Sequence, residues 1–245
     1  MSRELTFDSD IARGARGLRA RRVQEWLTLH GAGVVVDGAF GPATEAAVRA
    51  YQKRRSLAVT GIVDRATFDA LVAPMRRAVA PARATTTLGR TVVTVARRHL
   101  AEKPREAGGA NRGPWVRLYM DGNEGKDWPW CAGFATWVLR QAADAHGVRP
   151  PVSRTWSCDE LAGFAKSGDC FCRGTPTARA HVTPGSLFLS RHSPSDWTHV
   201  GIVLRTLPDH FETIEGNTND DGSREGHEVV RRVRGWEGKD FVMVR

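Results

Sequence analysis

The second half of the chain is organised around residues 128–139, which read Trp-Pro-Trp-Cys-Ala-Gly-Phe-Ala-Thr-Trp-Val-Leu. Pro129 favours a turn just before Cys131, and the apolar residues Phe134 and Trp137 follow at helical spacing. Cys131 is therefore expected at a helix N-terminus, where free N–H groups and the positive end of the helix dipole favour a thiolate. A thiolate with a base beside it is a nucleophile at neutral pH. The alternative is a small, buried, apolar cysteine.

The composition is ordinary for a globular protein of one large domain or two modest ones, with 41% hydrophobic and 26% charged residues in 245. The formal net charge of +9 is spread along the chain. Such a charge suits a polyanionic partner, either nucleic acid, an anionic membrane surface or an acidic cell-wall polymer. Four cysteines are too few for a disulfide framework at this length.

Targeting signals are not evident in the sequence. No run of about 18 apolar residues is present, so membrane insertion is not expected. The first residues lack the apolar region of a Sec signal peptide, and we expect the chain to be made in the cytoplasm without one.

The first 75 residues predict three helices. The first spans residues 17–30, the second starts at Pro42, and the third runs from about Asp64 to residue 73 and ends before Pro74. The motif Gly-x-apolar-x-x-Ala-Thr occurs at residues 38–44 and again at 61–67, and each copy opens a helix. This is a compact three-helix unit with a duplicated turn rather than a solenoid.

The pattern Asp37-Gly-x-Phe-Gly-x-x-Thr44-x-x-Ala-Val-x-x-Tyr-Gln52, followed by Leu57-x-Val-x-Gly-x-Val63, resembles the peptidoglycan-binding module of the PGBD type 1 family. The resemblance covers residues 10–75 and departs at Asp64, where the family has a second glycine. It implies a small helical wall-binding domain. Residues 76–90 are rich in Ala, Pro and Thr and are interpreted as a linker.

Residues 91–245 predict a second domain. Helices are expected over residues 91–103, from Cys131 to near Gly147, and after the capping box at Ser157, with a short element at 114–119 inside a loop. Alternation of period two then predicts strands at residues 186–190, 199–206, 210–215, 228–233 and 240–244. Helices followed by sequential strands favour an α+β domain with an antiparallel sheet, and the whole chain is expected to be multidomain.

A cysteine nucleophile needs a base and a third group that orients the base. His199 opens a predicted strand, and the next strand ends at Glu215. If these strands pair antiparallel, Glu215 can lie beside His199, and Asn217 would point to the same face. Asp196 is the nearest competing carboxylate in the sequence.

Together, Pro129-Trp-Cys131-Ala-x-Phe134, His199-Val-Gly-Ile-Val and Glu215-x-Asn217 resemble the CHAP family of cysteine, histidine-dependent amidohydrolases/peptidases. The upstream segment from Glu106 to Pro114 agrees as well. The resemblance implies a papain-like fold and hydrolysis of amide bonds in peptidoglycan. It assigns Cys131 as nucleophile, His199 as base, Glu215 as orienting group and Asn217 as a fourth member. Trp128 and Trp130 are candidates for a substrate groove, with core packing as the alternative.

Rival sites in this domain have weaker patterns. Cys158 also begins a predicted helix but lacks the flanking motif. Cys170-x-Cys172 with His181 matches no standard zinc spacing, and the segment from Asp121 to Asp127 resembles half a calcium loop without the glutamate at position twelve. No cofactor and no metal ion are therefore predicted.

The sequence thus predicts a two-domain peptidoglycan hydrolase, either an N-acetylmuramoyl-L-alanine amidase or a peptide endopeptidase, that acts on the cell wall in the periplasm or outside the cell. The alternative is a non-catalytic wall-binding or assembly protein on a degenerate CHAP scaffold. Nucleic-acid binding lacks any motif. Without a signal peptide, the chain fits a phage endolysin released by a holin, or an effector moved by a secretion machine and countered by an immunity protein.

Overall fold

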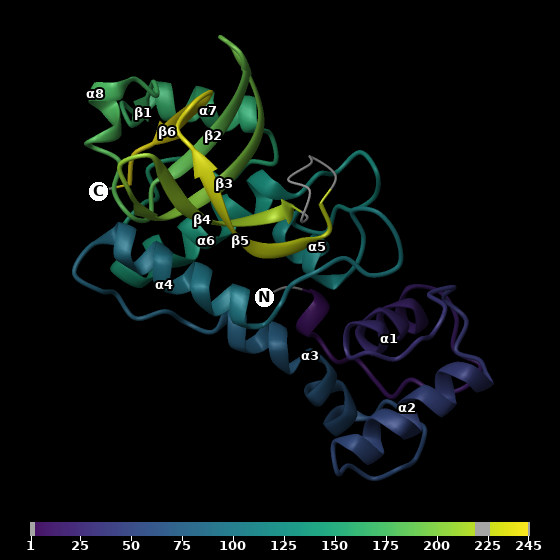
Figure 1. The fold of residues 1–245 in the computed structure, drawn as a ribbon. Helices are drawn as coiled ribbons and strands as arrows, with labels where there is room; N and C mark the ends of the chain where they lie inside the picture. The colour runs from purple at the N-terminus through teal and green to yellow at the C-terminus, as the bar shows by residue number, and fades with distance from the viewer. Residues whose placement is uncertain (1–2, 219–225, 245) are drawn as a thin grey trace. The chain divides into compact units, whose positions relative to one another are not determined.

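The computed structural model describes residues 3–218 and 226–244 (Figure 1). The chain divides into two compact units. Unit 1 comprises residues 1–77 and 105–126, and unit 2 comprises residues 78–104 and 127–245. The helical N-terminal region and the C-terminal antiparallel sheet that the sequence predicted are both present.

Unit 1 contains the three predicted helices, α1 (Leu18–Leu29), α2 (Pro42–Arg54) and α3 (Arg65–Val79), together with the 3-10 helix η1 (Arg3–Leu5) and α5 (Pro114–Tyr119). Pro42 lies at the first position of α2, as predicted. The predicted end of the third helix is wrong, because α3 continues through Pro74. An internal proline costs about 3 kcal/mol, and the full burial of Val72 and Met75 on this helix offsets it.

Two buried glutamines explain the duplicated turn of unit 1. Gln24 accepts a hydrogen bond from the Gly38 N–H (2.8 Å) and donates to the Ala39 carbonyl (3.1 Å) and Thr44 Oγ1 (3.2 Å). Gln52 on α2 makes the same contacts in the second copy of the motif. It accepts from the Gly61 N–H (2.9 Å) and donates to the Ile62 carbonyl (2.8 Å) and Thr67 Oγ1 (3.0 Å). The repeated Gly and Thr of the motif are therefore the partners of one buried amide in each copy.

Residues 105–126 belong to unit 1, whereas the sequence analysis placed them in the second domain. The buried Arg117 on α5 is the reason. Its guanidinium pairs with Glu4 (2.8 Å), with Glu25 (2.6 Å) and with Glu124 (2.8 Å). A buried arginine is tolerated only when carboxylates surround it, so this cluster ties α5 to η1 and α1.

Unit 2 contains α4 (Leu88–Ala101), α6 (Cys131–His146), α7 (Cys158–Ser167) and α8 (Pro176–Arg179). Three of these helices were predicted. Thr87 caps α4, which begins at Leu88 inside the predicted linker rather than at residue 91. Gly147 ends α6 in the left-handed conformation, and Ser157 caps α7 by accepting from the Glu160 N–H, both as predicted. Among the described residues, no helix is both long enough and apolar enough to span a bilayer.

The sheet of unit 2 has six strands within the described residues, in the order β1-β6-β2-β3-β4-β5, and its strand pairs are antiparallel. The five predicted strands correspond to β2 (Leu187–Ser193), β3 (Asp196–Thr206), β4 (His210–Thr218), β5 (Glu228–Gly235) and β6 (Lys239–Val242). The two-residue edge strand β1 (Phe171–Cys172) was not predicted, because its sequence is too short to show alternation. Helix α6 packs against β3 and β4, and α4 packs on α6.

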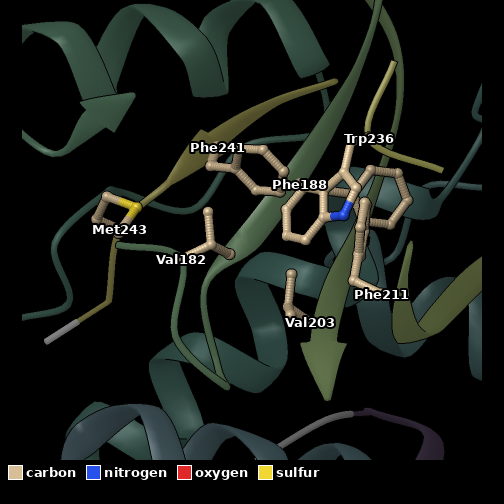
Figure 2. Close-up of a cluster of buried hydrophobic side chains, with 7 residues drawn as sticks. All are labelled: Val182, Phe188, Val203, Phe211, Trp236, Phe241 and Met243. Atoms are coloured by element: carbon tan, nitrogen blue, oxygen red, sulfur yellow. The ribbon is translucent and has the colours of Figure 1, made fainter. Parts of the chain in front are cut away.

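An aromatic cluster packs beside the central strands of the sheet (Figure 2). Figure 2 shows the rings of Phe188, Phe211, Trp236 and Phe241 gathered together, with Val182, Val203 and Met243 around them. The ring centroids of Phe211 and Trp236 are 4.8 Å apart, and those of Phe188 and Phe211 are 5.5 Å apart. The rings of Phe211 and Phe241 are 5.7 Å apart, so Phe211 joins β4 to both β2 and β6.

Replacing Gln52 should open the second turn of unit 1 and leave the first intact. In Gln52→Ala, the Gly61 N–H and the Ile62 carbonyl lose their partner, which costs about 1–3 kcal/mol of local stability. Hydrogen exchange followed by mass spectrometry on the full chain should show roughly 5- to 150-fold faster exchange over residues 57–67. Gln24→Ala is the matched control and should affect residues 34–44 instead. Equal exchange in the two variants would contradict the duplicated role.

Candidate active site

Cys131 is the first residue of α6, as the sequence predicted, and it is buried with 5% of its surface exposed. The start of this helix lies close to β4 because residue 216 is a glycine. A Cβ atom at Gly216 would lie 2.8 Å from the Phe134 side chain and 2.9 Å from Trp130. Such distances are steric clashes, so the glycine allows the N-terminus of α6 to approach the sheet.

His199 on β3 and Glu215 on β4 form a hydrogen-bonded pair. His199 Nε2 lies 2.8 Å from Glu215 Oε2, and both side chains are buried. The register pairs Val203 with Thr213 and Ile202 with Ile214, so Glu215 lies diagonal to His199 on one face of the sheet. The structure therefore brings together the histidine and the carboxylate that the sequence singled out. The other ring nitrogen, Nδ1, is buried and has no hydrogen-bond partner among the described residues.

Gly201 provides the space that Glu215 occupies. A Cβ atom at this position would lie 2.6 Å from Glu215 Cγ and 2.7 Å from Phe188 Cε1. Any side chain here would displace the carboxylate from His199. The glycine in the motif His199-Val-Gly201 is thus a spatial requirement of the pair.

Arg234 on β5 and Thr213 on β4 hold the carboxylate of Glu215 from the other side. Arg234 Nε donates to Oε1 (2.8 Å) and Nη2 donates to Oε2 (2.5 Å), which is a bidentate pair. Thr213 Oγ1 also donates to Oε1 (2.5 Å). Sequence reasoning missed both residues. The signal for Arg234 was weak, because it is one of several arginines on β5 and the register places it opposite Phe211, with Val230 opposite Glu215.

The three groups shift one another's pKa values. The hydrogen bond with Cys158 is the largest cause that lowers the pKa of Cys131, and interaction with His199 adds to it, against the opposing effect of burial. Burial alone would lower the pKa of His199, but Cys131 and Glu215 outweigh it and raise that pKa to about 9. Burial would raise the pKa of Glu215, but Arg234 and His199 lower it to about 2. These shifts favour the charged form of each group, which is a thiolate on Cys131, an imidazolium on His199 and a carboxylate on Glu215.

Two further sequence candidates are placed differently from Glu215. Asn217 is buried, but its φ of 54° and a register shift between Glu215 and Thr218 interrupt the alternation that was expected to put residues 215 and 217 on one face. The role of Asn217 stays a prediction. Asp196 lies at the first position of β3, and the carboxylate bonded to His199 is that of Glu215.

The two tryptophans before Cys131 have different environments. Trp130 is fully buried and packs against Gly216. It therefore takes the core position that was the alternative, and its predicted place in a substrate groove is wrong. Trp128 is half-buried and meets Trp156 edge-to-face at 6.0 Å between ring centroids. Trp156, which sequence reasoning did not select, is 39% exposed.

Cys170 and Cys172 are the two cysteines outside the helix starts. In residues 3–218 and 226–244, no group of three or more His, Cys, Asp or Glu side chains has a metal-binding arrangement. The thiol of Cys170 lies near the carbonyls of Ala165 and Pro151, and that of Cys172 near the carbonyl of Arg173.

Comparison with known proteins identifies one part of the chain. Residues 16–71 match the family described as a putative peptidoglycan binding domain. This peptidoglycan binding domain coincides with α1, α2 and the first half of α3 in unit 1. This match confirms that the peptidoglycan-binding resemblance predicted for residues 10–75 names the correct family.

Individual relatives cover parts of the chain. A stretch of 67 residues is 37% identical to the Zinc D-Ala-D-Ala carboxypeptidase of Streptomyces albus G, and it covers 26% of this chain and 26% of that protein. The chain thus spans about a quarter of the length of this curated relative.

Solved structures with similarity include a peptidoglycan-binding protein from Clostridioides difficile in complex with glutamine hydroxamate. It is 39% identical, with a TM-score of 0.25 over 25% of this chain and 39% of that one. The Burkholderia AP3 phage endolysin is 21% identical, with a TM-score of 0.27 over 66% of this chain and 61% of that one. TM-scores this low carry no argument about the fold of the whole chain.

Cys131 should be alkylated by iodoacetamide at a lower pH than Cys170 and Cys172. Its pKa is lowered by Cys158 and His199, whereas burial raises the pKa of Cys170 and of Cys172. Mass spectrometry of the full chain, alkylated between pH 5 and 10, should show Cys131 reacting well below the pH at which Cys170 reacts. Parallel profiles for the two cysteines would contradict the thiolate at Cys131.

Proposed function

We propose that the chain is a peptidoglycan hydrolase in which Cys131, His199 and Glu215 cleave an amide bond. The observation that carries the proposal is the hydrogen bond between His199 and Glu215 beside a helix-terminal cysteine of lowered pKa. A nucleophile, a base and an orienting carboxylate in this order are the elements of cysteine-dependent acyl transfer. The motifs around them support a CHAP-type, papain-like domain.

In the first half of the reaction, the Cys131 thiolate attacks the carbonyl carbon of the amide. The carbonyl oxygen takes the electron pair, and the backbone N–H of Cys131, which has no partner within its helix at this first position, donates to the oxyanion. His199 then gives its Nδ1 proton to the leaving nitrogen as the C–N bond breaks. The amine departs and a thioester remains on Cys131.

In the second half, water attacks the thioester carbonyl and His199, now neutral, accepts its proton. The C–S bond breaks, the carboxylic acid leaves and the thiolate and imidazolium are restored. Glu215 keeps the ring oriented through Nε2 and stabilises its charge, while Arg234 and Thr213 keep Glu215 in place. Arg234 is therefore a positioning residue.

The peptidoglycan binding domain brings the catalytic groups to their polymer. The family match over residues 16–71 and the identity to a carboxypeptidase named for a D-Ala-D-Ala bond support a wall polymer as the ligand of the whole chain. The protein acts on the cell wall, and the amide is either the muramoyl–alanine bond or a peptide bond. Trp128 and Trp156 form an aromatic wall before Cys131 and Cys158, suited to stacking against the substrate.

Cys131→Ala should abolish hydrolysis while the fold is kept, because alanine fits the buried site and lacks the nucleophile. Solubilised peptidoglycan should show new amino groups with the wild type and none with the variant. Mass spectrometry of the wild-type products identifies the bond, since an amidase frees the N-terminus of L-alanine and an endopeptidase frees an amine within the peptide. Cys170→Ala is the control and should stay active. Near wild-type turnover by Cys131→Ala would refute the mechanism.

Glu215→Gln should reduce kcat by orders of magnitude with little change in KM, because the charge that stabilises imidazolium is lost while the shape is kept. Cys131 and Glu215 together raise the pKa of His199 to about 9, so neutralising Glu215 should lower that pKa and move the alkaline limit of activity to lower pH. The pH profile of kcat/KM measures this shift. Asp196→Asn is the matched control and should keep the wild-type profile. The reverse result would assign the orienting role to Asp196.

Wall retention should depend on the duplicated turn of unit 1. In the inactive Cys131→Ala chain, adding Gln24→Ala and Gln52→Ala should reduce co-sedimentation with insoluble peptidoglycan at least several-fold. Point variants suit this test better than truncation, because residues 105–126 need Glu4 and Glu25 as partners of Arg117. Undiminished retention would place wall binding outside the peptidoglycan binding domain.

A further inference from the structure

Two cysteines meet beside the candidate active site. Cys131 is the first residue of α6 and Cys158 is the first residue of α7, and their Sγ atoms lie 3.9 Å apart. The two cysteines have 5% and 8% of their surface exposed. The described mechanism uses Cys131 and leaves Cys158 without a chemical step.

The contact between the two sulfur atoms is held by the segment that precedes α7. Arg154 donates to the Gly133 carbonyl (2.6 Å) and to Thr136 Oγ1 (2.7 Å), both in the first turns of α6. Thr136 in turn donates to the Thr155 carbonyl (3.2 Å). These bonds join the first turns of α6 to the segment directly before α7, and so keep the two cysteines close to each other.

Cys158 influences the chemistry of Cys131. The two sulfur atoms share a hydrogen bond, and this contact is the largest cause of the lowered pKa of Cys131, which favours the thiolate there. A thiolate reacts readily with peroxides, and a neighbouring thiol is what resolves the product.

We propose that Cys131 and Cys158 are a modification site, at which hydrogen peroxide converts the two thiols into a reversible disulfide. The Cys131 thiolate attacks one peroxide oxygen, the O–O bond breaks, and Cys131 becomes a sulfenic acid while hydroxide takes a proton to leave as water. The sulfur of Cys158 then attacks the sulfenic sulfur, the S–O bond breaks, and the oxygen leaves as a second water with the thiol proton. Two thiols are oxidised and one peroxide is reduced to two waters.

In the disulfide, the sulfur of Cys131 is bonded to Cys158 and cannot attack a carbonyl. Hydrolysis therefore stops until a thiol reductant restores the free thiols. This consequence rests on the proposed function, whereas formation of the cross-link does not. Cys158 also limits damage, because a sulfenic acid without a partner is oxidised further to the irreversible sulfinic acid.

The test treats the reduced full chain with hydrogen peroxide, blocks free thiols at acidic pH and digests with trypsin without reduction. Mass spectrometry should show peptide 127–140 linked to peptide 155–166 at the summed mass less two hydrogen atoms. In Cys158→Ser, this species should be lost and Cys131 should accumulate as sulfinic acid. The control variants Cys170→Ser and Cys172→Ser should form the linked peptide as the wild type does.

Oxidised wild type with Cys158 still free and Cys131 as sulfinic acid would overturn the proposal, and so would a cross-link from Cys131 to peptide 167–173. In the hydrolysis assay, reductant should restore peroxide-treated wild type and fail to restore Cys158→Ser. Equal recovery of both would also overturn it. Because the linked peptide is detected without peptidoglycan, a chain inactive in hydrolysis still gives a decisive result.

Discussion

The carboxylate of Glu215 is the constraint on which the candidate site depends. It accepts hydrogen bonds from His199, Arg234 and Thr213, and it is fully buried. Arg234 and His199 lower the pKa of this carboxyl to about 2, so Glu215 is a carboxylate paired with both groups. Removing Arg234 would leave that buried charge poorly compensated, and breaking a buried pair costs about 3–5 kcal/mol. Reactivity and local stability thus rest on the same contacts.

Two glycines make that array possible, through space rather than through backbone freedom. Gly201 leaves room for Glu215 beside His199, and Gly216 leaves room for Trp130 and Phe134 at the start of α6. The first allows Glu215 to lie beside His199, and the second allows the α6 terminus that carries Cys131 to approach β4. Trp130 packs against Gly216 and is fully buried, so its side chain does not reach the surface.

Unit 1 is held by buried polar groups of another kind. Gln24 and Gln52 each satisfy the backbone of one tight turn, and Arg117 gathers three carboxylates around one guanidinium. The glutamines lie inside the family match over residues 16–71, whereas Arg117 lies beyond it. Residues 105–126 therefore extend the core of unit 1 by an ion cluster that the matched domain does not contain.

The sequence by itself determined the elements whose signals are local. Caps and turns near Pro42 and Ser157 marked helix starts, alternation marked five strands of the sheet, and the motif around Cys131 marked the helix-terminal cysteine. Pairing of adjacent strands then predicted His199 beside Glu215, because neighbours in the chain are commonly neighbours in an antiparallel sheet.

Only the tertiary structure decided the contacts between residues whose side chains carry no local sign of their partners. Arg234 lies 19 residues from Glu215, Cys158 lies 27 from Cys131, and Arg117 lies 113 from Glu4. Helix α3 continues through Pro74 for the same reason, since burial of its apolar face outweighs a local signal to stop. Propensity and periodicity act over a few residues, whereas burial and charge pairing depend on what the folded chain brings together.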